Sequence, residues 1–461
     1  MDSIKTRESL GSRLGFILLS AGCAIGVGNV WMFPYRVGQN GGAIFVMFYV
    51  LFLIMMGIPV MTVEFSLGRA ARKSPVKMYQ ELEPKGSKWH IHGYLAMAGN
   101  YILMMFYTTV SGWMLYYFFA TVSGKLNGLS GEAVNAHYDG LVANPGMMML
   151  FMGIVVVLGF AVCSIGLQKG IEKITKYMML ALLALIIVLA VYSVVSDKSG
   201  QGIKFYLLPD FAALKESGTS VFDIIVAAMN QAFFTLSIGI GNMAIFGSYI
   251  GKDRSLMGEA VNVAALDTFV AFMSGLIIFP ACFAHGITPN AGPSLIFQTL
   301  PNVFNNLPAG RFFGSIFFLF LTFAAFSTVL TVFENIIACN CDLFGISRKK
   351  ASLINTVLIF GLSIPCILGF NVLSGFKPFG DGSNVLDLED FIVSNVLLPL
   401  GSMVFVLFAC HKFGFGWKNF RKEANEGKGL KVPSWMRIYM QFILPAIIFA
   451  LFIVGIVTKF A

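Results

Sequence analysis

The chain has 461 residues; 57% of them are hydrophobic, 12% are charged, and the mean hydropathy is +0.78. Soluble globular domains carry roughly 25% charged residues, so this composition excludes a soluble protein and indicates an all-α polytopic membrane protein. The formal net charge is +9. Its basic residues are spread over several loops instead of forming one stripe with interleaved aromatic residues, so the charge does not indicate a nucleic-acid partner.

Apolar stretches of about 20 residues predict eleven membrane-spanning helices. In chain order they lie at residues 14–37, 42–68, 94–122, 147–166, 174–195, 221–250, 257–285, 311–343, 351–370, 391–411 and 434–458. No linker rich in Ser or Pro separates them, so we expect a single domain.

Lysine and arginine residues set the expected orientation. With the N-terminus in the cytoplasm, the inner loops hold 24 of the 32 Lys and Arg residues and the outer loops hold 8. Cytoplasmic loops of membrane proteins carry such an excess. An odd number of spans then places the C-terminal Ala461 outside.

Two spans contain matching glycine-rich interruptions. Residues 25–29 (IGVGN) lie in the middle of the first span, and residues 238–242 (IGIGN) repeat the pattern in the sixth. Each glycine lowers helix propensity by about 1 kcal/mol, and unpaired backbone in hydrocarbon costs several kcal/mol more. Such breaks persist where backbone lines a cavity or holds a ligand, so two of them indicate a transport site.

Three ionisable side chains fall well inside predicted spans: Glu64, Asp267 and Glu334. Each costs about 2.5–3.5 kcal/mol to insert and is therefore a candidate functional group. Glu64 has a structural alternative, because a carboxylate can accept hydrogen bonds from amides where a helix unwinds. Glu334 can equally be a hydrogen-bonding group between helices. The sequence contains no catalytic motif, so we expect no enzymatic activity.

Oxygen-bearing side chains near the breaks indicate cation sites. Asn29, Thr235 and Asp267 could converge with free carbonyl groups, which are the ligands that a hard cation prefers. Ser327 and Thr328 supply two hydroxyl groups for a second cation. Their alternative role is hydrogen bonding to the preceding helical turn, as is common in membrane helices, and spacing alone leaves both roles open.

Long motifs resemble the neurotransmitter:sodium symporter family. Residues 11–45 (GSRLGFILLSAGCAIGVGNVWMFPYRVGQNGGAIF) resemble its first helix, and residues 230–249 (NQAFFTLSIGIGNMAIFGSY) its sixth. The similarity continues through LDTFVAFMSGLIIFP, FSTVLTVFE and LDLEDF. It implies a 5+5 inverted repeat with broken helices 1 and 6 around a midplane site. The repeats would be residues 1–200 and 220–412, with an additional helix 11 in 413–461.

The resemblance also implies the ligands of two sodium ions and a substrate. The first sodium would be held by the carbonyl group of Ala24 with Asn29, Thr235 and Asp267, and by the substrate carboxylate. The second would be held by the carbonyl groups of Gly22, Ile25 and Ala324 with the hydroxyl groups of Ser327 and Thr328. The implied substrate-binding residues are Ala24, Val27, Gly28, Leu103, Tyr107, Phe234, Thr235, Ser237, Ile240, Thr328 and Val332. The amides near Val27 and Gly28 would meet the substrate carboxylate, as a helix N-terminus favours an anion.

Two positions depart from the family pattern. Met32 replaces the usual arginine of the outer gate, although Asp390 matches its acidic partner; Arg7 and Asp342 match the inner gate. Asp267 replaces the more frequent asparagine of the first sodium site. Animal members that resemble this chain need chloride in a pocket that matches Tyr49 and Gln231 here. A fixed carboxylate gives the same electrostatic compensation, so we expect transport that is independent of chloride.

The expected function is sodium-coupled symport of a neutral, hydrophobic or aromatic amino acid by alternating access. The length resembles that of eleven-helix prokaryotic members, so we expect a bacterial inner-membrane protein with sodium as a co-transported ligand and no further cofactor. Two alternatives remain: a transporter of the same fold driven by protons or exchange, and a membrane receptor that does not transport.

Overall fold

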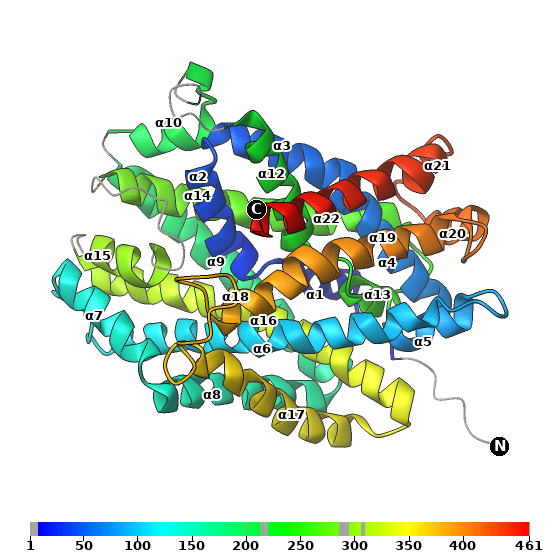
Figure 1. The fold of residues 1–461 in the computed structure, drawn as a ribbon, viewed down its shortest axis with the longest axis horizontal. Helices are drawn as coiled ribbons and strands as arrows, with labels where there is room; N and C mark the ends of the chain where they lie inside the picture. Colours follow the sequence, from blue (N-terminus) through cyan, green and yellow to red (C-terminus); the bar gives the residue numbers. More distant parts are fainter. Residues whose placement is uncertain are drawn as a thin grey trace.

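The computed structural model describes residues 8–197, 199–212, 214, 220–284, 295–305 and 309–460. These ranges form a bundle of long helices that run roughly along the longest axis of the molecule (Figure 1). Their only extended pairings are two isolated bridges, Arg254 with Lys428 and Pro378 with Gly380. The predicted all-α class is confirmed, and it follows from the need to satisfy every backbone hydrogen bond within the chain in lipid.

The first five predicted spans are all helical, and short π-helical turns (η) interrupt or begin some of them. The elements of this half are α1 (Arg13–Ala24), η1 (Gly28–Met32), α2 (Phe33–Gln39), α3 (Ala43–Phe52), η2 (Leu53–Gly57), α4 (Ile58–Ala71), α5 (Pro75–Leu82), α6 (His90–Val122), α7 (Gly131–Val142), α8 (Pro145–Ile165), η3 (Leu167–Glu172), α9 (Lys173–Ser196) and α10 (Gln201–Leu207).

The second half continues the same pattern of long helices with short connections. Its elements are α12 (Val221–Thr235), α13 (Asn242–Gly247), α14 (Leu256–Ala284), η4 (Leu295–Thr299), α15 (Leu300–Asn305), α16 (Gly310–Phe344), α17 (Arg348–Leu368), α18 (Val385–Phe391), η5 (Ile392–Leu397), α19 (Leu398–Cys410), α20 (Trp417–Ala424), α21 (Met436–Ile438), η6 (Tyr439–Ile443) and α22 (Leu444–Phe460).

Within the described ranges, nine helices are long and apolar enough to cross a membrane, and the bent pair formed by α1 with η1 and α2 counts as a tenth. The remaining predicted span, 221–250, is divided. Its first part, α12, has 15 residues, and its second part, α13, has only 6. Fifteen residues rise about 22 Å, which is less than the roughly 30 Å of hydrocarbon. The break predicted from the glycines therefore separates two half-helices, neither of which spans alone.

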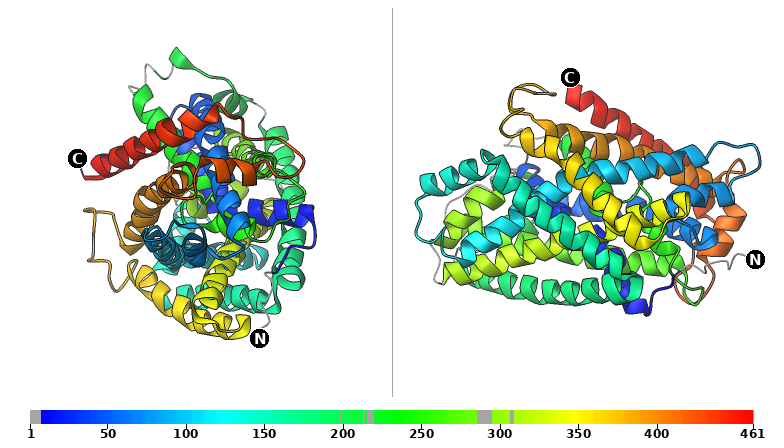
Figure 2. Two further views of the ribbon diagram at one scale, coloured as in Figure 1. Left: turned by 90° about the vertical axis from the view of Figure 1, so that its right-hand side faces the viewer. Right: turned by 90° about the horizontal axis from the view of Figure 1, so that it is seen from below.

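The long helices connect two ends of the molecule. Figure 1 shows α5 and α20 at one end and α7 and α15 at the other, and the right-hand view in Figure 2 agrees. We call them the inner end and the outer end, following the charge-based orientation, which stays a prediction. The packed helices α6 and α16 cross the whole bundle between them.

The first helix lies inside the bundle. α1 packs against α9, α14 and α16, and every residue from Leu18 to Ala24 is buried. A helix that is buried on all faces contacts protein instead of lipid. The break at the end of α1 is therefore surrounded by other helices, where irregular backbone is tolerated.

Candidate functional site

The first break lies between α1 and η1. Ile25, the C-cap residue of α1, has extended backbone (φ −71°, ψ 103°). The helical segments on the two sides of the break, Arg13–Ala24 and Gly28–Gln39, are bent by 56° relative to each other. Gly26 has almost no free space: an added Cβ would lie 2.2 Å from the Tyr107 hydroxyl oxygen and 2.6 Å from Oγ1 of Thr328. The glycine thus allows α6 and α16 to approach the unwound backbone closely.

The second break lies between α12 and α13 and uses left-handed backbone. Ser237, Gly239 and Gly241 have φ values of +50°, +104° and +78°. The Glu64 carboxylate of α4 accepts hydrogen bonds from the amides of Gly239 (2.5 Å) and Met243 (3.2 Å). The structural role considered for Glu64 in the sequence analysis therefore matches its position, because the carboxylate satisfies amides that the unwound helix leaves without partners.

The three side chains expected at the first cation site meet in the bundle interior. Nδ2 of Asn29 donates to Oδ1 of Asp267 at 2.8 Å, and Oγ1 of Thr235 donates to Oδ2 at 3.0 Å. Asp267 and Asn29 are fully buried. The Tyr49 hydroxyl lies 3.4 Å from Oδ2 of Asp267, and Gln231 donates to the Gly28 carbonyl at 3.1 Å. The positions that match a chloride pocket thus adjoin the Asp267 carboxylate and the first break.

The residues expected at the second cation site also converge. Oγ1 of Thr328 lies 3.3 Å from the carbonyl oxygens of both Gly22 and Ile25. Oγ of Ser327 lies 3.4 Å from the Ile25 carbonyl oxygen and 2.9 Å from that of Ala324. The contact to Ala324 is the bond to the preceding turn that the sequence analysis considered. Both hydroxyl groups also reach across to the first break, which hydrogen bonding within one helix does not explain.

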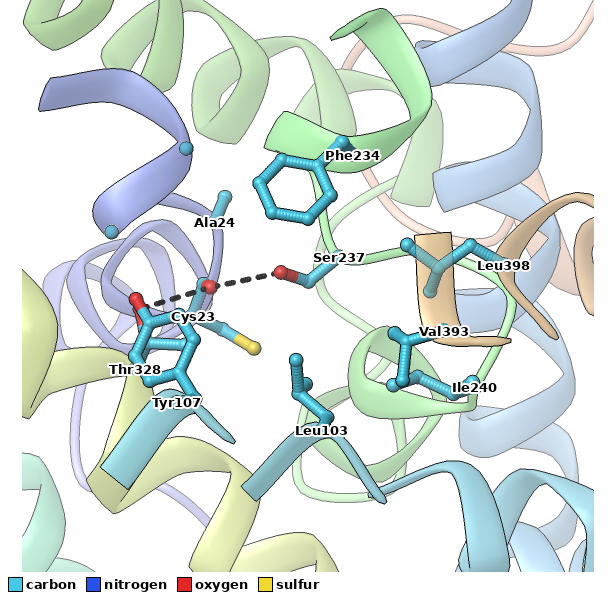
Figure 3. Close-up of a pocket in the computed structure, with 12 residues that line it drawn as sticks. Cys23, Ala24, Leu103, Tyr107, Phe234, Ser237, Ile240, Thr328, Val393 and Leu398 are labelled. Atoms are coloured by element: carbon cyan, nitrogen blue, oxygen red, sulfur yellow. Dashed lines mark hydrogen bonds between the residues drawn. The ribbon is translucent and has the colours of Figure 1, made fainter. Parts of the chain in front are cut away.

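A small pocket lies between the two breaks and is shown in Figure 3. Its free volume is about 20 Å³. Its walls are Cys23, Ala24, Gly26, Gly28, Leu103, Tyr107, Phe234, Ser237, Ile240, Thr328, Val393 and Leu398. The Tyr107 hydroxyl accepts a hydrogen bond from the Val27 amide at 3.0 Å, and the Ser237 hydroxyl donates to the Cys23 carbonyl at 3.3 Å. Apart from these groups the walls are predominantly apolar.

Most of the implied substrate-binding residues line this pocket, and three do not. Val27 lines a second cavity nearer the outer end, Thr235 faces Asp267, and Val332 is buried in α16 away from the pocket walls. The sequence analysis missed Cys23, Gly26, Val393 and Leu398. Cys23 and Gly26 adjoin residues that it did include. Val393 and Leu398 come from η5 and α19, and nothing in the local sequence distinguishes them from other apolar residues of that span.

The second cavity adjoins the pocket, because Tyr107 and Phe234 line both of them. It has about 240 Å³ of free volume and is lined by Val27, Trp31, Met32, Tyr35, Phe106, Tyr107, Val110, Phe234, Leu386, Asp387 and Asp390. Met32 and Asp390, the matched outer-gate positions, thus face one cavity, but Met32 carries no charge. The positive charges that act on Asp390 are those of Arg36, one turn further along α2, and of Lys459. The sequence analysis did not identify Arg36.

At the inner end, Asp342 accepts a hydrogen bond from the Ser74 amide at 2.7 Å. Its expected partner Arg7 lies outside the described residues. Nearby, the fully buried Glu334 pairs with Arg348 and accepts a hydrogen bond from Tyr249 at 2.5 Å. Arg348 also donates to the Cys163 carbonyl at 3.0 Å. Glu334 therefore joins helices, as one of its two predicted roles required, and it does so through an ion pair.

Two broken helices around a buried site that is rich in oxygen atoms define a membrane transporter of the discontinuous-helix type. The chain belongs to the sodium:neurotransmitter symporter family, whose model matches residues 7–135 and 132–460. It is a multi-pass membrane transporter and not an enzyme.

The relatives cover nearly the whole chain. An uncharacterized sodium-dependent transporter of Bacillus subtilis, YhdH, is 35% identical over 96% of this chain and 96% of its own length. A second, from Haemophilus influenzae, is 33% identical over 97% and 98%. The crystal structure of MhsT in complex with L-phenylalanine superposes with a TM-score of 0.86 at 37% identity and covers 97% of this chain and all of that one. These likenesses confirm the predicted family and fold.

Proposed function

We propose that this protein carries a neutral, hydrophobic or aromatic amino acid across the cell membrane together with sodium, by alternating access. The observation that carries the proposal is the meeting of Asn29, Thr235 and Asp267 at the first break, beside an apolar pocket. A carboxylate, an amide and a hydroxyl group in one buried cluster are oxygen donors for a hard cation. A buried cluster of this kind inside a membrane protein marks an ion pathway.

In this proposal the first sodium replaces the direct hydrogen bonds of the cluster. It binds to the Ala24 carbonyl, Oδ1 of Asn29, Oγ1 of Thr235 and the Asp267 carboxylate. The second sodium binds to the carbonyl groups of Gly22, Ile25 and Ala324 with Ser327 and Thr328, which already lie within 3.4 Å of those carbonyls. Both ions then bridge the broken first helix to α14 and α16, so that ion binding and helix packing depend on each other.

The amino acid is proposed to bind with its carboxylate at the amides near Val27 and Gly28 and at the Tyr107 hydroxyl. Its side chain would point toward Leu103, Phe234 and Ile240. None of the pocket walls carries a charge, and an unpaired buried charge is costly, so lysine and glutamate should be rejected. The likeness to MhsT, which was solved with L-phenylalanine, supports an aromatic or aliphatic substrate.

The pocket must change shape during transport. About 20 Å³ of free volume corresponds to roughly one water molecule, far less than an amino acid requires. The larger cavity lies on the outer side of the same residues Tyr107 and Phe234. We propose that the substrate enters through this outer cavity and that the pocket widens by movement of Phe234 and of the half-helices around the breaks.

A thermal-shift panel tests the proposal. The purified protein is heated with each of the twenty amino acids, in sodium and in potassium or choline. A ligand at 100 times its dissociation constant stabilises by about 2.7 kcal/mol, so a hydrophobic or aromatic amino acid should raise the melting temperature in sodium only. An equal response in choline at low pH would favour proton coupling instead. A sodium-dependent response without uptake into proteoliposomes would favour a receptor.

A further inference from the structure

Glu389 is a buried carboxyl group to which the proposed transport cycle assigns no role. It lies in α18 near the outer end, and 4% of the residue is exposed. Apart from a weak interaction with the Cys366 thiol, neither carboxylate oxygen has a hydrogen-bond partner within the described part of the chain. Its neighbours differ: Asp387 accepts from the Asn384 amide at 2.8 Å, and Asp390 accepts from the Ser394 hydroxyl at 2.7 Å.

Glu389 is not among the residues that line the outer cavity. Asp387 and Asp390 both line that cavity. Successive residues of a helix are rotated by about 100°, so Glu389 faces a different side of α18. α18 packs on α6 and α17, and the contact is close. A Cβ added at Gly369, just after α17, would lie 2.9 Å from Cβ of Val385.

Among the described residues, the groups that face Glu389 offer no compensating positive charge. From α17 comes the Cys366 thiol, a weak donor that also interacts with the Thr109 hydroxyl of α6. From α18 itself, Asp387 adds a negative charge that acts on the same thiol. The basic residues of this region, Arg36 and Lys459, act on Asp390. No ion pair to Glu389 occurs among the described residues.

Such surroundings require a neutral carboxyl group. An ionised carboxylate that is buried without a partner costs several kcal/mol, and a group in this position takes up a proton instead. The packing of α18 on α6 and α17 is therefore compatible with protonated Glu389 and is opposed by ionised Glu389.

The neighbouring backbone can respond to a change of this charge. α18 is followed by the π-helical turn η5 (Ile392–Leu397), a distortion that is frequent at functional sites. On its other side, α18 borders the outer cavity through Leu386, Asp387 and Asp390. Ionised Glu389 could reach water by a rotation or outward shift of α18 into this space.

We infer that Glu389 is a proton-binding site through which the pH outside the cell controls the packing of α18 against α6 and α17. Acidic external pH keeps the helix packed as in this structure. Alkaline external pH ionises Glu389 and releases α18. The same helix carries Asp390 and leads to the pocket residue Val393, so the external pH regulates the outer side of the substrate pathway.

The bound proton can be observed directly. Infrared spectra of the purified wild type and of Glu389→Gln are recorded in lipid at acidic pH. The spectrum of the variant is then subtracted from that of the wild type. The difference should contain one protonated-carboxyl band, which declines when the external pH becomes alkaline. The other buried carboxyl groups cancel in the subtraction. If the difference shows an ionised carboxylate at every pH, the inference is wrong.

The release of α18 can be tested with Cys366, which is fully buried and interacts with Glu389. Intact cells are treated with a membrane-impermeant thiol reagent, and labelling of Cys366 is measured by peptide mass mapping. Labelling of Cys366 should increase with external pH more steeply in the wild type than in Glu389→Gln. The ratio of the two labelling rates should rise by at most about tenfold per pH unit, because one proton is released. The variant corrects for the intrinsic reactivity of the thiol.

Two further variants complete the test. Glu389→Met, which is apolar and of similar length, should behave like Glu389→Gln. Glu132→Gln removes an exposed carboxylate of α7 at the same end and should keep the wild-type pH dependence. Equal labelling of the wild type and Glu389→Gln at every pH would overturn the inference. It would also be overturned if Cys366 labelling in both Glu389 variants depended on external pH as it does in the wild type.

Discussion

The side-chain amide of Asn29 donates a hydrogen bond of 2.8 Å to the carboxylate of Asp267. The same amide lies 3.1 Å from the Asp267 carbonyl oxygen. These contacts join the broken first helix to the middle of α14, where Thr235 of the second broken helix also meets the carboxylate. The Asp267 carboxyl group therefore lies between the two breaks, next to the residues that match a chloride pocket.

Replacement of Asp267 by asparagine should reveal the charge of this group in the ion dependence of transport. We expect wild-type uptake to be equal in chloride and in gluconate, because the carboxylate compensates the charge of sodium. Asp267→Asn should lose uptake or require chloride. Asp223→Asn, which changes an exposed carboxylate of α12, is the control and should resemble the wild type. A wild type that requires chloride would refute this role.

Substitution of Gly26 by alanine should block the site without changing any ligand side chain. The added methyl group would lie 2.2 Å from the Tyr107 hydroxyl and 2.6 Å from Oγ1 of Thr328. Overpacking of this kind costs about 1–3 kcal/mol, so sodium-dependent substrate binding should weaken roughly tenfold or more. Gly361→Ala in α17 meets no atom within 4 Å and should bind normally. Calorimetric titration of both variants decides; unchanged binding by Gly26→Ala contradicts the geometry.

Removal of the Glu64 carboxylate should destabilise the unwound part of the sixth span. Glu64→Ala leaves the amides of Gly239 and Met243 without their acceptor, at about 1–3 kcal/mol for each. Glu64→Gln keeps one acceptor oxygen and should be intermediate. The melting temperature in detergent should therefore fall from the wild type to Glu64→Gln and further to Glu64→Ala. Glu81→Ala, which changes an exposed residue of α5, is the control. An alanine variant as stable as the wild type would show that water or other groups replace the carboxylate.

The ion pair between Arg348 and Glu334 should show strong coupling. Arg348→Ala leaves a buried carboxylate without its cation and should lower stability by about 3–5 kcal/mol. The double variant Arg348→Ala with Glu334→Gln should recover part of this loss, because the remaining group is neutral. Lys349→Ala removes an exposed neighbouring charge and should have little effect. Additive effects of the two single substitutions on the unfolding free energy would contradict the pairing.

The membrane class and the breaks were accessible from the sequence because they depend on local free energies. The transfer of an apolar stretch into lipid and the low helix propensity of residues 25–29 and 238–242 are properties of single segments. The cost of burying an ionisable group likewise marked Glu64, Asp267 and Glu334. The sequence could not show how short α12 and α13 are, since the extent of unwinding depends on what satisfies the freed amides.

By itself, the sequence determined a polytopic helical protein with two matching breaks and the oxygen-bearing residues Asn29, Thr235 and Asp267 near them. Only the tertiary structure decided their partners. It placed Val393 and Leu398 in the pocket, paired Glu334 with Arg348, and left Glu389 buried with only the Cys366 thiol as a weak partner among the described residues. The physical reason is that hydrophobicity and helix propensity act within one segment. A hydrogen bond, an ion pair or a cavity wall depends on which helices pack together, and those helices are far apart in the chain.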